Sequence, residues 1–435
     1  MRLAWYSNHP VAPTGYGGQT KQVTKRLLAA GHEVHVLSNY GGQQAGCGIT
    51  DYSGITVWPQ GVSQYSTETV DAQAAEIKPD FVFTLYDVWP MNKNQFRGFP
   101  TMSWVPVDHY PVGPEVVDWL RGTEQAGPRP AIAMSEFGQR AMSEAGIKST
   151  YIPHAIEAHF RPTESDVRQR MQVPDDAFLI GINAANIGKF PPRKAWGENL
   201  QAVSALMHEH DDVYIYLHTD LQRPGGVDLP SLINILDMDP NRIRSVDPLS
   251  YRVGLTTEED LAELYSAMDV LLAASAGEGF GIPVVEAMRC GTPAIVTDFS
   301  AQPEIVGDTG WRVEFQLQYD YGQGSFLATP YVPSIIAALS ESYAERSTAA
   351  AVERSAIARE RGDLYDADTV FEDKWLPLLD KMREASTRGK AAKSGLAVPA
   401  SPGLVAPDGQ PINRAVRPKS KKRKRSQKRG NQQGR

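Results

Sequence analysis

The chain has 435 residues, of which 41% are hydrophobic and 22% charged, and its formal net charge is −7. This length is two to three times the roughly 150 residues of a typical domain, and the composition excludes a chain that is disordered or fibrous throughout. No run of about 18 apolar residues predicts a transmembrane helix, and the opening MRLAWYSNHP lacks the apolar core of a secretory signal. Only two cysteines occur, Cys47 and Cys290, which excludes a disulfide framework or a cysteine-based zinc site and leads us to expect a cytoplasmic protein.

The first half alternates short apolar runs with helix-like stretches. Strands are predicted at 2–8, 33–39, 81–87, 100–106 and 131–135, and helices at 19–31, 68–78 and 136–145. This alternation predicts a parallel sheet with helices on both faces.

The pattern restarts after a proline-containing connection at 151–162. Strands are predicted at 178–185, 213–219, 270–275, 293–298 and 311–315, and helices at 195–209, 230–237 and 258–267. We therefore expect two α/β halves with a cleft between them. The apolar stretch 364–384 is expected to pack as a closing helix.

The charge is distributed unevenly along the chain. Residues 385–435 hold 14 Lys and Arg against one acid, Asp408, so residues 1–384 carry a net charge of −20. Nine of these basic residues fall within 417–429. We predict a disordered basic tail over 385–435. Its candidate partners are a nucleic acid, an anionic membrane surface or an acidic protein, and the alternative is a tail that only adds solubility.

The most informative stretch is SAGEGFGIPVVEAMRCGTPAIVTD at 275–298, which predicts strand, glycine loop, helix and strand. The glycines allow close approach to a ligand, and the helix that starts near Ile282 offers its N–H groups to a diphosphate. Glu286, one turn further on, is placed to accept hydrogen bonds from ribose hydroxyls. Glu278, at the strand end, is placed to hold a sugar hydroxyl. From spacing alone, two ordinary surface carboxylates remain an equal alternative.

This stretch resembles the E-x7-E donor-site signature of family-4 retaining glycosyltransferases. AGHEV at 30–34 and TDFSAQPEIVGDTGW at 297–311 are also similar to segments of that family, and the resemblance covers roughly residues 1–384. It implies the GT-B fold, which is α/β with two Rossmann-like domains facing across a cleft. The implied parts are an acceptor domain at 1–155, a donor domain at 156–363 and a closing helix at 364–384 that returns to the first domain. The implied donor-binding residues of the signature are Glu278, Gly279, Phe280, Gly281 and Glu286.

A basic loop, NIGKFPPRKAWGENLQAV at 186–203, precedes a predicted helix. Lys189, Arg193 and Lys194 cluster where a phosphate can bind, and a solvated basic loop is the alternative. In the resembling family an Arg and a Lys of this loop neutralise the donor diphosphate. Lys194 matches the family lysine, whereas Asn186 and Gly188 stand near the position of the family arginine, so Arg193 or Lys189 would have to replace it.

Two further stretches follow predicted strands of the first half. PTGYGG at 13–18 resembles the family's glycine loop, with Gly15 and Gly17 nearest the donor phosphates. A dinucleotide-binding domain is excluded here because the spacing is not G-x-G-x-x-G and no acid follows the second strand. In VPVDHYP at 105–111, Asp108 and His109 both suit the polar position at which the family contacts the reacting sugar, and either can be the residue that acts.

The implied activity is that of a hexosyltransferase-type enzyme that uses a nucleoside-diphosphate sugar, retains the anomeric configuration and needs no cofactor or metal. Metal-dependent glycosyltransferases of another fold use Asp-x-Asp, but Asp237-Met-Asp239 and Asp366-Ala-Asp368 are expected to be chance occurrences. Asp108, His109, Lys194 and Glu278 are the candidate catalytic residues. The alternatives are a nucleic-acid-associated protein bound through its tail and an inactive sugar-nucleotide binder. A glycan, a lipid, a protein hydroxyl, a small metabolite and a modified nucleobase are all candidate acceptors.

Overall fold

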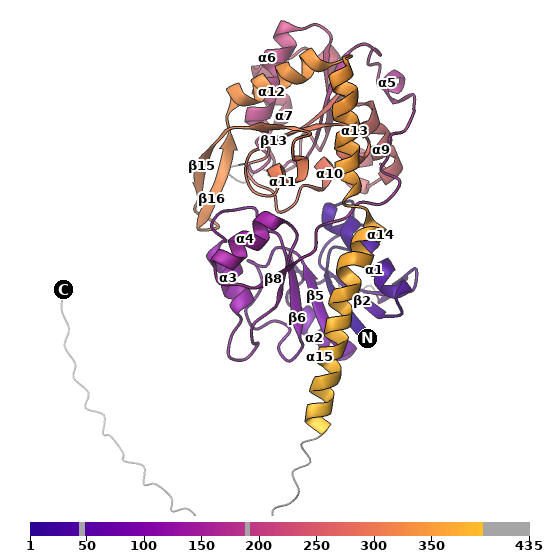
Figure 1. The fold of residues 1–435 in the computed structure, drawn as a ribbon, viewed down its shortest axis with the longest axis vertical. Coiled ribbons are helices and arrows are strands. Elements are labelled where there is room, and N and C mark those ends of the chain that lie inside the picture. Colours follow the sequence, from indigo (N-terminus) through magenta and orange to yellow (C-terminus); the bar gives the residue numbers. More distant parts are fainter. Residues whose placement is uncertain (43–47, 188–191, 395–435) are drawn as a thin grey trace, which may run out of the picture. The chain divides into compact units, whose positions relative to one another are not determined.

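Two sheets of mostly parallel strands organise the chain (Figure 1). The computed structural model describes residues 1–42, 48–187 and 192–394. Residues 1–383 form one compact unit. Of the helices in these described ranges, none combines the length and the apolar character needed to cross a bilayer.

The first sheet has eight strands, in the order β3 (Thr50–Tyr52), β4 (Ile55–Trp58), β2 (Glu33–Ser38), β1 (Arg2–Ser7), β5 (Phe81–Leu85), β6 (Thr101–Val105), β7 (Ala131–Ala133) and β8 (Ser149–Tyr151). All neighbours are parallel except β3, which pairs antiparallel with β4. Its helices are α1 (Gly15–Ala29), α2 (Val70–Ile77), α3 (Pro114–Arg121) and α4 (Glu136–Glu144). The inner strands are apolar and buried on both faces, as expected of a sheet covered by helices.

The second sheet has six parallel strands, in the order β11 (Ile243–Ser245), β10 (Val213–His218), β9 (Phe178–Asn183), β12 (Val270–Ala273), β13 (Ala294–Thr297) and β14 (Trp311–Val313). Its helices are α5 (Val167–Arg170), α6 (Trp196–Glu209), α7 (Leu229–Ile235), α8 (Pro248–Val253), α9 (Glu258–Ala267), α10 (Ile282–Arg289), α11 (Gln302–Val306), α12 (Val332–Glu345) and α13 (Ala349–Asp363). Strand order reverses between β9 and β12, which makes their carboxyl ends the topological switch point.

The predicted α/β fold class is confirmed, and the main strands lie where apolar runs predicted them. A hairpin, β15 (Phe315–Asp320) and β16 (Ser325–Pro330), is absent from the prediction. Its sequence FQLQYD alternates apolar and polar residues and is followed by a turn at Gly322–Gly324, which is the usual hairpin signal. The predicted strand at 311–315 ends at Val313, and Phe315 begins the hairpin instead.

The chain ends its compact unit by packing against the first sheet. After α14 (Ala367–Val370) and a π-helical turn at Phe371–Trp375, α15 runs over Leu376–Ser394. The ring of Trp375 lies 5.8 Å from those of Trp5 and Phe83 and 5.1 Å from that of Trp104. The helix continues beyond residue 384, where the sequence predicts the disordered tail to begin, because the Ala-, Lys- and Arg-rich segment favours helix. The remaining predicted tail, 395–435, lies outside the described residues.

Two glycines allow backbone segments from the two sheets to touch. A Cβ at Gly277 would lie 2.2 Å from the carbonyl oxygen of Asp108, and one at Gly279 would lie 2.8 Å from Cβ of Pro106. Any larger residue at these positions would therefore push the loop after β12 away from the loop after β6.

We expect Gly277→Ala to lower stability by about 1–3 kcal/mol, because the added methyl group meets a backbone oxygen that cannot rotate away. Gly197→Ala is the control, since a Cβ there has no atom closer than 3.9 Å and lies in the first turn of α6. That control should raise stability by roughly 0.5 kcal/mol. Thermal unfolding and small-angle scattering measure both variants. Wild-type stability and wild-type dimensions for Gly277→Ala would contradict the expectation.

Candidate functional site

The candidate site forms where loops at the carboxyl ends of strands from both sheets meet. Residues 184–187 and 192–194 follow β9 and residues 274–281 follow β12, so both loops lie at the switch point of the second sheet. Residues 106–109 follow β6 of the first sheet. The Arg193 carbonyl accepts from the Ala276 N–H at 2.7 Å, which joins the two switch-point loops.

Glu278 is the centre of the charged cluster at this place. Its Oε1 lies 2.5 Å from Nζ of Lys194, and its Oε2 accepts from Nη1 of Arg193 at 2.8 Å. The same Arg193 nitrogen donates to the Gly277 carbonyl at 2.7 Å, so the guanidinium is held by a backbone and a side-chain acceptor. Burial opposes ionisation of Glu278, but Arg193 and Lys194 outweigh it and lower the pKa of this carboxyl to about 2. Glu278 is therefore ionised at neutral pH.

Asp108 and His109 extend the cluster into the first half. Oδ2 of Asp108 lies 3.7 Å from Nε of Arg193, and its Oδ1 lies 2.6 Å from Nδ1 of His109. Nε2 of His109 lies 3.2 Å from Oδ2 of Asp320, in the hairpin. Burial alone would lower the pKa of His109, but the two carboxylates raise it above its usual value. Asp108 thus faces the basic pair, whereas both His109 nitrogens are engaged by carboxylates.

Glu286 belongs to a separate hydrogen-bond network. It lies on α10, and its Oε2 accepts from the Tyr265 hydroxyl at 2.8 Å. Nδ2 of Asn183, at the end of β9, donates to the same hydroxyl at 2.6 Å. Burial raises the pKa of Glu286 to about 7, an effect that the Tyr265 bond opposes.

The predicted glycines have different structural roles. A Cβ at Gly17 would lie 2.2 Å from the Ala12 carbonyl oxygen, so this glycine lets its own loop close. A Cβ at Gly15 would lie 3.0 Å from Cδ1 of Ile282, so Gly15 faces the start of α10. Gly281 precedes α10 with φ of +116°, a conformation that favours glycine.

Phe280, another residue of the predicted signature, is only 3% exposed. Its ring lies 5.3 Å from that of His154 and 5.4 Å from that of Tyr365. The side chain therefore packs in the core beside the site. Lys189, the third predicted cation of the basic loop, lies outside the described residues.

Both Asp-x-Asp tripeptides have structural roles. Asp239 accepts from the Asn241 N–H at 2.9 Å and caps a 3-10 turn. Asp366 accepts from the Asp368 and Thr369 N–H groups at 3.1 Å and caps α14. Across residues 1–42, 48–187 and 192–394, no three His, Cys, Asp or Glu side chains gather as they would around a metal ion.

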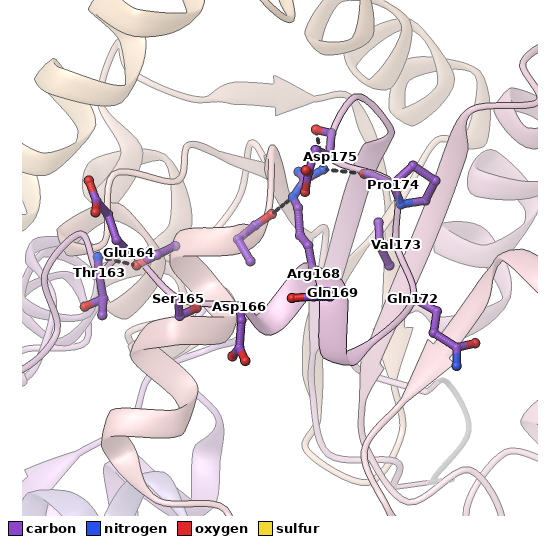
Figure 2. A pocket seen from close by; sticks show the side chains of 12 residues that line it. Thr163, Glu164, Ser165, Asp166, Arg168, Gln169, Gln172, Val173, Pro174 and Asp175 are labelled. Atoms are coloured by element: carbon purple, nitrogen blue, oxygen red, sulfur yellow. Dashed lines mark hydrogen bonds between the residues drawn. The ribbon is translucent and has the colours of Figure 1, made fainter.

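The cluster does not coincide with the hollow drawn in Figure 2. That hollow has a volume of about 860 Å³ and is lined by residues of α5 and of the segments beside it. Arg168, seen there among its neighbours, donates to the carbonyl oxygens of Ala267 and Ala177 at 2.9 and 2.8 Å and to Asp269 at 2.8 Å. This arginine is therefore committed to holding the loop together, and the hollow contains none of the predicted site residues.

Sequence reasoning missed three residues of these networks: Asn183, Tyr265 and Asp320. Tyr265 contacts Glu286 and Asp320 contacts His109, while Asn183 contacts Tyr265, and none of these pairs is related by local spacing. A signal did exist for Asp320, because the alternating pattern and glycine turn predict a hairpin, but that pattern does not indicate its contact with His109.

The family match to known proteins falls within the second half of the chain. Residues 183–318 match the family model for Glycosyl transferases group 1. The serotype-specific mannosyltransferase WbdA of Escherichia coli is 24% identical over 244 residues, a match that covers 53% of this chain and 27% of that protein. The MMP alpha-(1->4)-mannosyltransferase of Mycolicibacterium hassiacum is 34% identical over 151 residues, or 35% of this chain and 31% of that protein. The chain thus spans less than a third of the length of either relative.

Solved structures match nearly the whole compact unit. Sucrose-phosphate synthase from Thermosynechococcus elongatus has a TM-score of 0.66 at 19% identity, covering 89% of this chain and 100% of that one. WaaG, a glycosyltransferase involved in lipopolysaccharide biosynthesis, has a TM-score of 0.63 at 14% identity, covering 86% and 98%. The chain therefore has the α/β fold of GT-B glycosyltransferase structures, and its residues 183–318 match the Glycosyl transferases group 1 model.

The pKa of Glu286 predicts how this carboxyl affects stability. The folded state binds the proton of this carboxyl more tightly than the unfolded state does, because the pKa rises from 4.5 to about 7 on folding. The protonated group therefore contributes its full stabilisation below pH 4.5, and this contribution is lost as pH rises through 7. Glu286→Gln removes this titration. The free energy of unfolding of the variant relative to wild type should therefore be higher at pH 8 than at pH 5, by up to about 3 kcal/mol. Thermal unfolding from pH 5 to 8 measures this. Glu341→Gln, an exposed change on α12, is the control. A difference from wild type that does not vary with pH would refute the expectation.

The contact between Asp320, in the hairpin, and His109 also predicts how stability depends on pH. A histidine with a raised pKa stabilises the folded state below 6.5, and this contribution is lost as pH rises through the higher folded-state value. Asp320→Asn should therefore cost about 1 kcal/mol at pH 6 and much less at pH 9. Urea unfolding at both pH values measures the difference, with the exposed hairpin change Gln316→Ala as control. Equal losses at both pH values would show that Asp320 acts without His109.

Proposed function

We propose that this protein is a retaining glycosyltransferase that moves a sugar from a nucleoside-diphosphate sugar to an acceptor without a metal ion. The observation that supports this most strongly is the ionised Glu278, shared by Arg193 and Lys194 at the switch point of the second sheet. The mannosyltransferase relatives and the Glycosyl transferases group 1 match point to the same reaction class.

The charges suit the proposed chemistry. Cleavage of a sugar–diphosphate bond leaves negative charge on the phosphate, which preorganised cations stabilise. Arg193 offers a planar fork and Lys194 a point charge, and the N–H groups at the start of α10 add further donors. A donor diphosphate would take over contacts that these cations now make with Glu278, and that carboxylate would then accept from a sugar hydroxyl.

In the proposed reaction the bond from the anomeric carbon to the phosphate breaks, and a bond to the acceptor oxygen forms on the same face. The leaving phosphate accepts the acceptor's proton. Asp108 faces Arg193 from the first half, which supports a role for it beside the proposed reacting centre. His109 orients Asp108 from its other side. The low cysteine content supports a cytoplasmic reaction. The predicted anionic partner of residues 417–429 concerns residues outside the described structure.

The test is thermal stabilisation by a panel of nucleotide sugars without added metal. A structure similar in fold, HepE from Anabaena, was solved with UDP and glucose, so UDP-glucose belongs in the panel beside GDP-mannose and ADP-glucose. A ligand that binds only the folded state raises the free energy of unfolding, by about 2.7 kcal/mol at 100 times its Kd, and the melting temperature rises with it. We expect one donor to stabilise the wild type but neither Glu286→Ala nor Arg193→Ala.

Glu341→Ala, an exposed change outside the site, is the matched control and should respond like the wild type. The stabilising donor is then incubated with the enzyme, and proton NMR identifies the first sugar anomer released by slow hydrolysis. Release of the inverted anomer argues against retention. Stabilisation by no donor, with or without magnesium, argues against the proposed function as a whole.

A further inference from the structure

Tyr265 connects the end of β9 to Glu286. The residue lies on α9 and is 1% exposed. Its hydroxyl donates to Oε2 of Glu286 at 2.8 Å and accepts from Nδ2 of Asn183 at 2.6 Å. The three residues come from three different elements, so the contact depends on the folded second half rather than on local spacing.

The direction of these hydrogen bonds is determined by the donors available. An asparagine Nδ2 can only donate, so the Tyr265 oxygen must act as its acceptor. The phenol carries one proton, and that proton is then directed at the Glu286 carboxylate. Asn183 therefore orients the hydroxyl, and the hydroxyl in turn occupies one defined oxygen of Glu286.

The tyrosine is itself held firmly. Its carbonyl oxygen accepts from the Thr292 hydroxyl at 2.6 Å, and its ring lies 6.3 Å from that of Phe160. Because Tyr265 is buried and held both at its backbone carbonyl and at its hydroxyl, it can support the flexible side chain of Glu286. A free glutamate loses rotamer entropy when it is ordered, and a support that is already in place before the ligand binds removes part of that cost from binding.

The bond also affects the charge on Glu286. Burial and, to a smaller extent, the charge of Glu258 raise the pKa of this carboxyl to about 7, against the lowering effect of the Tyr265 bond. Glu258 itself faces Lys21 at 3.0 Å and His159 at 3.5 Å. Loss of the phenol proton would therefore leave Glu286 both less ordered and less often ionised.

We propose that Tyr265, oriented by Asn183, is a positioning residue that holds Oε2 of Glu286 so that Oε1 accepts hydrogen bonds from the vicinal hydroxyls of a bound ribose. This inference rests on the proposed function and on the sequence-based expectation that Glu286 accepts hydrogen bonds from the ribose hydroxyls of the donor. It adds that the ribose preference of the site depends on a hydroxyl that does not touch the ligand.

The test compares binding of ribonucleotides with that of nucleotides that lack both ribose hydroxyls. UDP, GDP and ADP and their 2′,3′-dideoxy counterparts are titrated calorimetrically into the full chain. For the nucleotide that binds the wild type, Tyr265→Phe should weaken the ribonucleotide about five- to tenfold and leave the dideoxy form unchanged. Glu286→Ala should abolish the difference between the two forms.

Tyr343→Phe is the matched control, because the Tyr343 hydroxyl donates to Oδ1 of Asp212 at 2.8 Å and lies outside these networks. It removes the same kind of bond and should not change either affinity. Asn183→Leu keeps the Tyr265 hydroxyl but frees its proton to turn away, so it should give a smaller loss that is also confined to the ribonucleotide.

The outcomes separate the two proposals. An equal loss for both nucleotide forms in Tyr265→Phe means a structural role and overturns the inference. Unchanged binding in Tyr265→Phe, together with loss of discrimination in Glu286→Ala, overturns the inference and leaves the proposed function intact. Discrimination that survives in Glu286→Ala, or binding of no nucleotide, overturns the assignment of Glu286 and the inference with it.

Discussion

The charge balance around Glu278 is the constraint on which the rest of the site depends. Two cations and a carboxylate sit where loops from both sheets meet; the side chains of Glu278 and Lys194 are 13% and 17% exposed, whereas that of Arg193 is 39% exposed. Removal of the carboxylate would leave Lys194 without its carboxylate partner and Arg193 with Asp108, at 3.7 Å, as its remaining one. Removal of either cation would raise the cost of keeping the carboxylate ionised. The charges of the site thus balance one another, and in the proposed function a donor diphosphate would replace the carboxylate as the partner of the two cations.

The topology explains why these groups meet. In a sheet whose strand order reverses, the loops on either side of the reversal diverge and leave their backbone groups available at one edge. The second sheet places the basic loop, after β9, and the glycine loop that contains Glu278, after β12, on the two sides of such a reversal. The first sheet adds Asp108 from the loop after β6. Small residues at 277 and 279 then allow the two edges to approach to van der Waals distance.

Much of the fold could be predicted because each central strand is a short apolar run with a clear boundary. The two acidic positions and the basic pair could also be proposed, since local spacing places them after strands and before helices. The different contacts of Asp108 and His109 could not be predicted, because His109 is engaged by Asp320, which lies more than 200 residues further along the chain. Tyr265 was missed for the same reason: an apolar-looking helix position becomes a polar contact only when α9 and α10 pack together.

The position of Trp375 has a consequence for synthesis. The core of the first sheet is completed by this residue, whose ring packs against those of Trp5, Phe83 and Trp104. A ribosome delivers the strands of that sheet long before it delivers the tryptophan that covers them. The amino-terminal half must therefore wait, with part of its aromatic core uncovered, until the second half has been made. Its final consolidation therefore follows synthesis of the second half, and a chain terminated before residue 375 would leave this surface open to chaperones or to aggregation.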